Sequence, residues 1–377
     1  MAGCIKDEAP NAEADILDIS FEDNILSRNT IQYNPAYDAT LGAYPLEVTV
    51  KLGTDLSSLS PIFTLTDGAT ISPASGSTQD FSQGRVVYEV TSQDGKWVKT
   101  YSINIMEQAV EDIPLVYHFE EANSVIGLLA SSDPYQVLID RDDELDLELE
   151  WASGNPGYNW AKTTAATDDY PTCLYDDGYV GKCAKLTTKD TGSLGKMAGM
   201  PIAAGNLFMG SFDMTNAVKA PLESTIFGIN FCYKPLSVSG YFKYTAGDEY
   251  YEDGQYTDTQ DMMSIYALFY EGASTYDSAG NPLDDFSLDG NIGDYDYEDD
   301  HMVALAIYDN PHETDEWTYF EMEFDYDRYG KSIDGTKLAN GVYKISLVFA
   351  ASDQGGHFKG APGSTLLVDE VTLTIEE

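Results

Sequence analysis

The segment EWTYFEMEFDYD, residues 316–327, carries the residue types that carbohydrate chemistry needs. If it forms a β-strand, its side chains alternate between two faces. One face then presents Trp317, Tyr319, Glu321 and Glu323, and the other face is apolar. Aromatic rings stack on the apolar faces of sugars, and carboxylates accept hydrogen bonds from hydroxyls. The segment therefore predicts a glycan-binding sheet face, with an ordinary solvent-exposed acidic face as the alternative.

The two glutamates of this segment are also the candidate catalytic residues. Side chains at positions i and i+2 of a strand lie roughly 6.6–7 Å apart. Retaining glycosidases hold their carboxyl groups about 5–5.5 Å apart, and inverting ones about 6.5–9.5 Å. Because side chains rotate, the spacing of Glu321 and Glu323 does not decide between these geometries. A glycoside hydrolase with this carboxylate pair on a concave sheet stays open beside simple binding.

Three further segments carry side chains that suit a ligand. SGYFKY (239–244) alternates as a strand, and the rings of WASGNPGYNW (151–160) that follow the Pro-Gly pair are expected to be exposed on a loop. SDQGGHFKGAPGS (352–364) holds four glycines, which let a backbone approach a ligand closely. The candidate ligand-binding residues of these segments are Tyr241, Lys243, Tyr158, Trp160 and His357.

The closing segment GSTLLVDEVTLTIEE, residues 363–377, reads as a strand with two acids in its middle. Alternation places Asp369 on one face with Leu367 and Val371, and Glu370 on the other. The face that holds Asp369 is otherwise apolar, so we expect it to point to a core. A carboxylate in that position needs a partner.

The charge of the chain is strongly acidic. There are 20 Lys and Arg against 64 Asp and Glu, a net charge of −44, and residues 244–327 contain no Lys or Arg. Phosphate binding needs basic patches, which excludes nucleic acid as a partner. Two interpretations of the acidity remain: solubility of an exposed cell-surface protein, and binding of divalent cations, since Ca²⁺ takes oxygen ligands.

The chain opens MAGCIKDEAPNAEAD, in which Ala-Gly-Cys resembles the end of a bacterial lipobox. The resemblance implies that Cys4 carries a lipid, that residues 1–15 are a solvated tether, and that the protein is an outer-membrane lipoprotein exposed at the cell surface. A chance tripeptide is the alternative. The sequence as written contains neither a signal peptide nor a stretch long enough to span a bilayer.

Cys173 and Cys183 flank LYDDGYVGK, which reads as a hairpin with an Asp-Gly turn. Opposed across such a hairpin, the two cysteines could form a disulfide in an oxidising compartment. Buried free thiols are the alternative. No Cys-x-x-Cys spacing is present, which speaks against a zinc site.

Short β-type runs separated by Gly, Pro, Asn and Asp dominate the chain, which indicates an all-β protein. Residues 16–107 contain about seven such runs, the number typical of an immunoglobulin-like sandwich, and we expect them to form a spacer domain. EQAVEDIP then reads as a linker. Residues 115–377 form the second predicted domain, a larger β-sandwich.

Several phrases of the second domain resemble the putative carbohydrate metabolism domain family of gut-bacterial surface lipoproteins. The phrases are YHFEE (117–121), WASGNPG (151–157), YPT (170–172), GKCAKLTTKDTG (181–192), IAAGNLFMGSF (202–212), SGYFKYTAGDEY (239–250) and VFAASDQGGHFKGAPGSTLLVDEVTL (348–373). The resemblance implies a β-jelly roll behind an Ig-like domain. It brings no agreed catalytic residues, and the family name rests on fold analogy.

The jelly-roll resemblance also suggests a structural metal. In many carbohydrate-binding jelly rolls an early Phe-Glu and an Asp of the last strand share a Ca²⁺, and the matching residues are Glu120 and Asp369. A cation would relieve the repulsion between two such carboxylates. A salt bridge to Lys185 and hydrogen bonds to loop amides are the alternatives. No catalytic cofactor is predicted.

Together these features predict a cell-surface lipoprotein whose jelly-roll domain binds oligo- or polysaccharides during glycan capture. The enzyme alternative is a glycoside hydrolase or another carbohydrate-active enzyme that uses Glu321 and Glu323. The second alternative is a structural or adhesin component with a protein partner.

Overall fold

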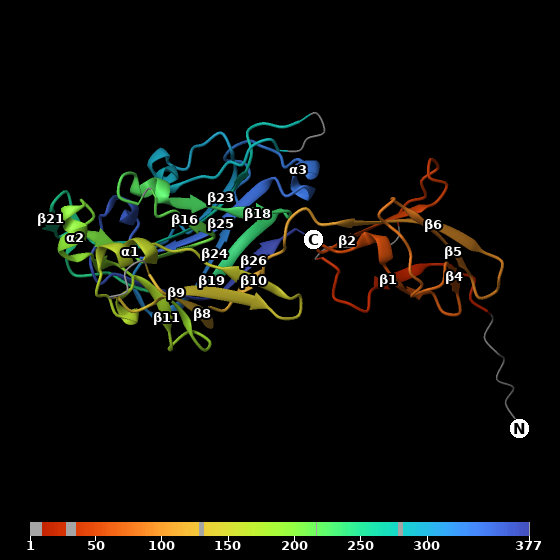
Figure 1. Cartoon of the computed structure of the whole chain (residues 1–377), viewed down its shortest axis with the longest axis horizontal. Helices are drawn as coiled ribbons and strands as arrows, with labels where there is room; N and C mark the ends of the chain where they lie inside the picture. The colour runs from red at the N-terminus through yellow and green to blue at the C-terminus, as the bar shows by residue number, and fades with distance from the viewer. Residues whose placement is uncertain (1–9, 28–34, 128–131, 216, 278–281, 377) are drawn as a thin grey trace, which may run out of the picture. The chain divides into compact units, whose positions relative to one another are not determined.

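The computed structural model describes residues 10–27, 35–127, 132–215, 217–277 and 282–376. The chain divides into two compact units, residues 1–112 and 113–376 (Figure 1). Both units are built mainly from strands, so the all-β prediction is confirmed. Cys4 and the rest of residues 1–9 lie outside the described residues, so the predicted lipid anchor is not tested.

The first unit contains a four-stranded and a two-stranded sheet. The larger sheet has the order β2-β6-β5-β4, with β2 parallel to β6, and the smaller sheet pairs β1 with β3. Val48, Tyr88 and Ile103 are buried in the core of this unit. Its strands are β1 (Ile16–Ser20), β2 (Tyr44–Val50), β3 (Ile62–Leu65), β4 (Thr70–Ser72), β5 (Val86–Thr91) and β6 (Val98–Glu107).

The second unit is a sandwich whose first layer is a six-stranded sheet. Its order is β11-β12-β26-β19-β24, and β7 also pairs with β26. The opening and closing strands of the unit therefore lie side by side, with Tyr117 opposite Val371. The strands are β7 (Val116–Tyr117), β11 (Thr172–Tyr175), β12 (Cys183–Thr187), β19 (Pro235–Thr245), β24 (Thr314–Glu323) and β26 (Thr365–Ile375).

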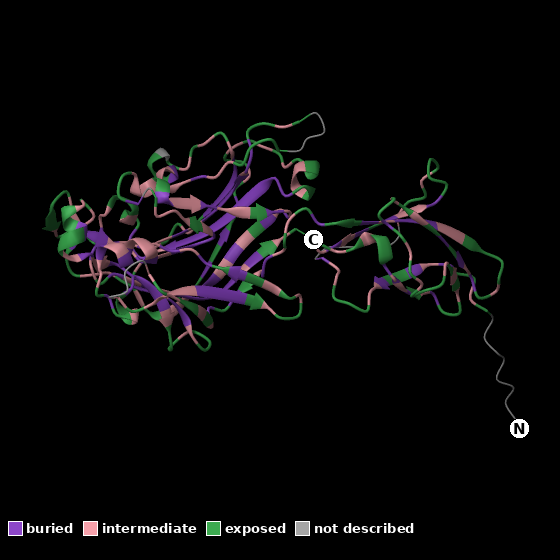
Figure 2. Cartoon of the chain, in the orientation of Figure 1, coloured by how far each residue is buried: buried purple, intermediate pink, exposed green. Residues whose placement is uncertain are grey.

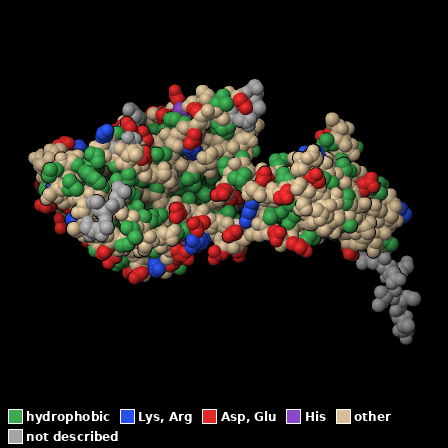
Figure 3. Space-filling model, in the orientation of Figure 1, with side chains coloured by type: hydrophobic (Ala, Val, Ile, Leu, Met, Phe, Trp, Pro, Cys, Tyr) green, Lys and Arg blue, Asp and Glu red, His purple; other side chains and the backbone are tan. Residues whose placement is uncertain are grey.

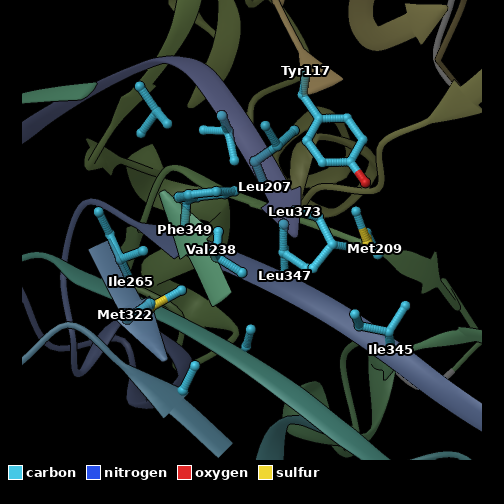
Figure 4. Close-up of a cluster of buried hydrophobic side chains, with 14 of the residues drawn as sticks. Tyr117, Leu207, Met209, Val238, Ile265, Met322, Ile345, Leu347, Phe349 and Leu373 are labelled. Atoms are coloured by element: carbon cyan, nitrogen blue, oxygen red, sulfur yellow. The ribbon is translucent and has the colours of Figure 1, made fainter. Parts of the chain in front are cut away.

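The second layer is a five-stranded sheet of order β15-β25-β22-β23, in which β18 also pairs with β25. Side chains from the two layers meet in one core, where Val238 and Met322 of the first layer approach Phe349 of the second (Figure 4). Burying one such side chain stabilises the fold by about 1.5–3 kcal/mol. The strands are β15 (Asn206–Phe208), β18 (Ile229–Phe231), β22 (Ser264–Glu271), β23 (Met302–Ile307) and β25 (Tyr343–Ala350).

Smaller elements complete the second unit, and the buried strands run through its middle (Figure 2). No helix among the described residues is both long and apolar enough to cross a bilayer. These elements are β8 (Glu121–Val125), β9 (Tyr135–Asp142), β10 (Leu147–Glu150), β13 (Lys189–Asp190), β14 (Ile202–Ala203), β16 (Gly210–Phe212), β17 (Thr225–Phe227), β20 (Tyr250–Glu252), β21 (Gln255–Thr257), α1 (Asn155–Ala161), α2 (Gly192–Met197), α3 (Gly335–Ala339) and the 3₁₀ turn η4 (Gly290–Tyr295).

Strand β26 departs from the alternation expected of its sequence. Leu366 and Val368 face the core, but after Asp369 and Glu370 the core side chains are Val371 and Leu373. Glu370 adopts a left-handed φ of 49°, and the pairing with β19 shifts register at this point. A β-bulge of this kind inserts one residue and switches the faces of the strand. The predicted core-facing position of Asp369 is therefore wrong, because its side chain points away from the core.

Cys173 and Cys183 lie on the predicted hairpin of β11 and β12, but they do not face each other. Cys173 is opposite Lys185, and Cys183 is opposite Tyr175. Both cysteines are buried free thiols. Burial raises the pKa of the Cys183 thiol to about 12. The predicted disulfide is wrong because the hairpin register offsets the two cysteines by two residues.

Candidate functional site

A cavity of about 670 Å³ lies over the outer face of the five-stranded sheet. Phe208, Tyr266 and Val348 form part of its floor, and their positions in β15, β22 and β25 are register partners. Because side chains alternate along a strand, the neighbours Leu207 and Leu347 point instead into the sandwich core. The second sheet thus places a row of apolar side chains at the base of an open space.

The sides of the cavity come from segments far apart in the sequence. Helix α1 contributes Tyr158 and Trp160, and the region of η4 contributes Asp294 and Tyr297. Both predicted ligand-binding residues of this helix thus line the cavity. Tyr158 is buried rather than exposed, because it packs against Tyr170 with ring centroids 5.8 Å apart. Its predicted exposure is wrong, although it does line the cavity.

The glycine-rich loop 352–360 forms another side of the cavity and brings in Asp353 and His357. A fully buried carboxylate holds the base of this loop. The Oδ2 atom of Asp261 accepts hydrogen bonds from the hydroxyl groups of Ser352 and Ser364, both at 2.6 Å, and from the amide of Ala361 at 2.7 Å. Asp261 therefore ties both ends of the loop to the start of β22, and so positions the loop over the sheet.

The charged side chains that line the cavity are mainly acidic. No Lys or Arg is among its described lining residues, and the Nε2 atom of the lining residue His357 lies 2.5 Å from Oδ1 of Asp294. Burial raises the pKa of Asp353, and the charge of Asp261 adds to this shift. Acidic side chains are also spread over the visible face of the molecule in Figure 3. The cavity therefore suits an uncharged ligand better than an anionic one.

The other predicted binding residues gather on the outer face of the six-stranded sheet. Tyr241 lies opposite Tyr319 in the pairing of β19 with β24, and their ring centroids are 5.5 Å apart. The Nζ atom of Lys243 lies 5.3 Å from the ring centre of Trp317. A fourth ring joins them from the loop between β11 and β12. We call this set the outer ring cluster, which comprises Tyr179, Tyr241, Trp317 and Tyr319.

Glu321 and Glu323 lie exposed on the same outer face, where they are opposite Ser239 and Ser237 of β19. The predicted inward face of this strand is confirmed, because Phe320 and Met322 are buried. Neither glutamate lines the cavity. The pair belongs to β24 in the other layer, and its catalytic role stays a prediction.

Asp369 and Glu120 both anchor the loop 176–182. The amide of Val180 donates to Oδ2 of Asp369 at 2.9 Å, and the amide of Lys182 donates to Oε1 of Glu120 at 3.0 Å. Lys185, the alternative partner, instead lies with Nζ 4.9 Å from the ring centre of Tyr175. These contacts match the alternative in which Glu120 and Asp369 accept hydrogen bonds from backbone amides of a loop.

The pair Glu120 and Asp369 offers few ligands for a metal. Within the described residues, no three or more His, Cys, Asp or Glu side chains are grouped to hold an ion. Ca²⁺ takes about six to eight oxygen ligands, and these two carboxylates already accept amide hydrogen bonds. The residues therefore do not fit a Ca²⁺ site well, and the structural calcium stays a prediction.

Sequence reasoning did not find the acids and several rings of the cavity. Asp353 lies inside the glycine-rich segment, four residues before His357, but no pattern in the sequence singles out this carboxylate. Asp294 and Tyr297 lie in an acidic run that resembles a solvated loop. Tyr266 belongs to the apolar run of β22, where no pattern tells which face is covered. Only the folded chain brings these residues together.

Comparisons with known proteins agree with this architecture. The family described as "Putative carbohydrate metabolism domain" matches residues 118–374, and the family described as "SGBP, N-terminal", a domain of surface glycan-binding proteins, matches residues 42–105. The second match is consistent with a cell-surface location. None of the curated proteins compared with the chain matches it.

The solved structures similar to the chain include two from Bacteroides species. One is described as a "putative glycoside hydrolase" from Bacteroides thetaiotaomicron, with 40% identity, a TM-score of 0.62 and 99% of each chain covered. The other has the same description, from Bacteroides vulgatus, with 43% identity, a TM-score of 0.65, and 71% of this chain and 100% of that chain covered. The chain therefore belongs to the putative carbohydrate metabolism domain family, with a carbohydrate-related domain at residues 118–374.

Proposed function

We propose that the protein binds an uncharged oligosaccharide in the cavity of the five-stranded sheet and captures glycans at the cell surface. The observation that carries this proposal is the cavity of about 670 Å³, which combines ring side chains with carboxylates and lacks Lys and Arg among its described lining residues. Sugar rings offer apolar faces to the rings, and their hydroxyls donate to Asp294 and Asp353. The match to an SGBP N-terminal domain supports a role in glycan binding. A lipid on Cys4 would hold the protein at the outer membrane.

The test is calorimetric titration of the full chain with uncharged oligosaccharides of different linkage. Trp160→Ala should weaken binding about 10-fold, which corresponds to about 1.4 kcal/mol, because it removes a ring at the cavity wall. Trp97→Ala is the matched control, since Trp97 is 62% exposed in the first unit. Equal affinity of the wild type and Trp160→Ala for every sugar that binds would contradict the proposal.

A glycoside hydrolase is the second candidate, and two observations favour it. Both solved relatives are described as "putative glycoside hydrolase". In addition, burial raises the pKa of Asp353 inside the cavity, which suits a carboxylic acid that donates a proton to a leaving oxygen. In this candidate Asp294, paired with His357, serves as the second carboxylate. The sequence-based pair Glu321 and Glu323 is its rival on the other sheet.

Incubation with polysaccharides and detection of new reducing ends tests this second candidate. Asp353→Asn should lower any activity by at least about 100-fold, because general acid catalysis contributes about 10²–10⁴-fold. Glu321→Gln and Glu323→Gln should leave it unchanged. Activity that survives Asp353→Asn and is lost in the glutamate variants would reverse the assignment.

A further inference from the structure

The rings of the outer ring cluster contact one another and so hold each other in place. Tyr179 stacks on Tyr241 with centroids 3.8 Å apart and an interplanar angle of 12°, and it meets the edge of Trp317 at 6.2 Å. Tyr179 is 46% exposed and Tyr319 is 51% exposed. Rings that brace one another in this way lose little conformational freedom when a ligand covers them.

Hydrogen bonds hold the loop that carries Tyr179 in place. Asp369 and Glu120 accept the amides of Val180 and Lys182, and the amide of Gly178 donates to the carbonyl of Gly181 at 2.9 Å. Gly181 has a φ of +63°, and a Cβ atom there would overlap the Glu120 carboxylate. The left-handed φ and the nearby carboxylate both favour glycine at this point. The two carboxylates therefore act as positioning residues for Tyr179.

We propose that the outer ring cluster is a second binding surface, which takes a segment of an uncharged polysaccharide on the sheet opposite the cavity. The three tyrosines and the tryptophan present apolar ring faces, and the tyrosines add hydroxyl groups. The exposed Glu321 follows Tyr319 along the same face. Pyranose rings match this surface, because they pair apolar C–H faces with hydroxyl donors.

The size of the surface favours a polysaccharide over a protein. A fully buried aromatic side chain contributes about 150–250 Å², so four partly covered rings offer no more than about 400 Å². A stable protein partner needs about 800 Å² on each side. A few consecutive sugar rings cover the smaller area, and the rest of a long polymer extends beyond it.

The charge of the surface favours an uncharged polymer. The ammonium of Lys243 borders this cluster, where it already lies over the ring of Trp317. Asp315, Glu316 and Glu321 are exposed on the same strand, and the chain as a whole has a net charge of −44. An anionic polysaccharide would be repelled by this field.

This inference is independent of the proposed cavity function, and one experiment separates them. Affinity electrophoresis of the full chain uses gels that contain a β-glucan, a xylan, a mannan, a galactan or, as the anionic probe, polygalacturonate. We expect at least one uncharged polymer to retard the wild type. Tyr179→Ala and Tyr319→Ala should each weaken that binding about 5- to 10-fold.

Tyr256→Ala is the matched control, since Tyr256 is 48% exposed on β21 and outside both sites. Retention of wild-type affinity by the double variant Tyr179→Ala/Tyr319→Ala overturns the inference. If only Trp160→Ala loses binding, the cavity function stands and this surface fails. Retardation by polygalacturonate alone also overturns the inference. So does self-association of the wild type in sedimentation runs, if the ring variants abolish it. If no polymer binds the wild type, this inference fails, whereas the cavity function is decided by the calorimetric titration with oligosaccharides.

The positioning role of Glu120 has its own readout. Glu120→Ala should weaken polysaccharide binding about as much as Tyr179→Ala does, because the loop loses the acceptor for the Lys182 amide. Glu120→Gln should restore it, since one amide oxygen can still accept that hydrogen bond. Oligosaccharide affinity of the cavity should be the same in both variants. Equal loss in Glu120→Ala and Glu120→Gln would contradict positioning through this hydrogen bond.

Discussion

The two outer faces of the sandwich in residues 113–376 differ in how they are covered. Over the five-stranded sheet, α1, η4 and the loop 352–360 surround a cavity. Over β19 and β24 the six-stranded sheet stays open, and a single loop brings Tyr179 to the rings of the strands. The first face can enclose a short ligand, and the second can only support one side of a long one.

This difference teaches how each candidate site depends on the rest of the chain. Strand alternation alone places Tyr241 and Tyr319 on one side, so a few strong local contacts define the open face. The cavity exists only while its loops are held in place, above all by the buried carboxylate of Asp261. Changes that loosen loops should therefore affect the two faces unequally.

The largest expected effect comes from Asp261→Ala. The substitution leaves the hydroxyls of Ser352 and Ser364 and the amide of Ala361 without their acceptor. Each unsatisfied buried donor costs about 1–3 kcal/mol, so the free energy of unfolding should fall by about 3 kcal/mol or more. Urea unfolding measures this loss.

The same variant separates the two faces. Oligosaccharide binding in the cavity should be lost, while polysaccharide binding at the outer ring cluster should persist under conditions in which the variant is folded. Asp258→Ala, at an exposed position three residues earlier, is the control and should behave as the wild type. Unchanged cavity binding in Asp261→Ala would show that the loop does not depend on this carboxylate.

The second prediction concerns Asp369 under the outer ring cluster. Burial raises the pKa of Asp369 from 3.8 to about 6, although the amides of Val180 and Glu370 oppose the shift. The native state therefore binds a proton more tightly than the unfolded state, and the stability from this group is full below pH 3.8 and is lost as the pH rises through 6. Between pH 3.5 and 7 the loss should be on the order of 2 kcal/mol.

Asp369→Asn provides the measurement, because an amide does not titrate in this range. Urea unfolding at several pH values should show that the free-energy difference between wild type and variant shrinks or reverses toward pH 7. Parallel stability curves of the two proteins would contradict the raised pKa.

A smaller effect is expected for Lys243→Met, which keeps the apolar stem and removes the ammonium over Trp317. A cation–π contact at an exposed site contributes about 0.5–1 kcal/mol, so the free energy of unfolding should fall by about 0.5 kcal/mol. Affinity for polymers should change less than that of Tyr179→Ala. Lys196→Met, whose ammonium pairs with Asp190 on the surface, is a control for loss of one positive charge. A loss of polymer binding as large as that of Tyr179→Ala would make Lys243 a direct ligand contact.

The smallest effect is expected from chelation. Since Glu120 and Asp369 accept amide hydrogen bonds from the loop, EDTA should leave the melting temperature unchanged. The sequence-based calcium hypothesis expects a fall instead, because a ligand that binds only the native state stabilises it. A drop that added Ca²⁺ reverses, and Mg²⁺ does not, would restore that hypothesis.

Much of the fold could be predicted from the sequence, because its strands carry clear patterns. The alternation of β24 correctly placed Phe320 and Met322 inside and Tyr319 outside. The same reasoning failed in β26, because a bulge at Asp369 and Glu370 breaks the period of two without a signal in side-chain polarity. It also could not set the hairpin register that keeps Cys173 and Cys183 apart.

The sequence by itself determined the all-β class, the acidic charge and the rings on the outer face of β24, since each follows from composition or from a local period of two. Only the tertiary structure decided which sheet carries the cavity and which acids line it. Asp294 and Asp353 are 59 residues apart, and they meet at one cavity because loops from different strands fold over the same sheet. Long-range closure of this kind depends on packing and register, which no local pattern of residues encodes.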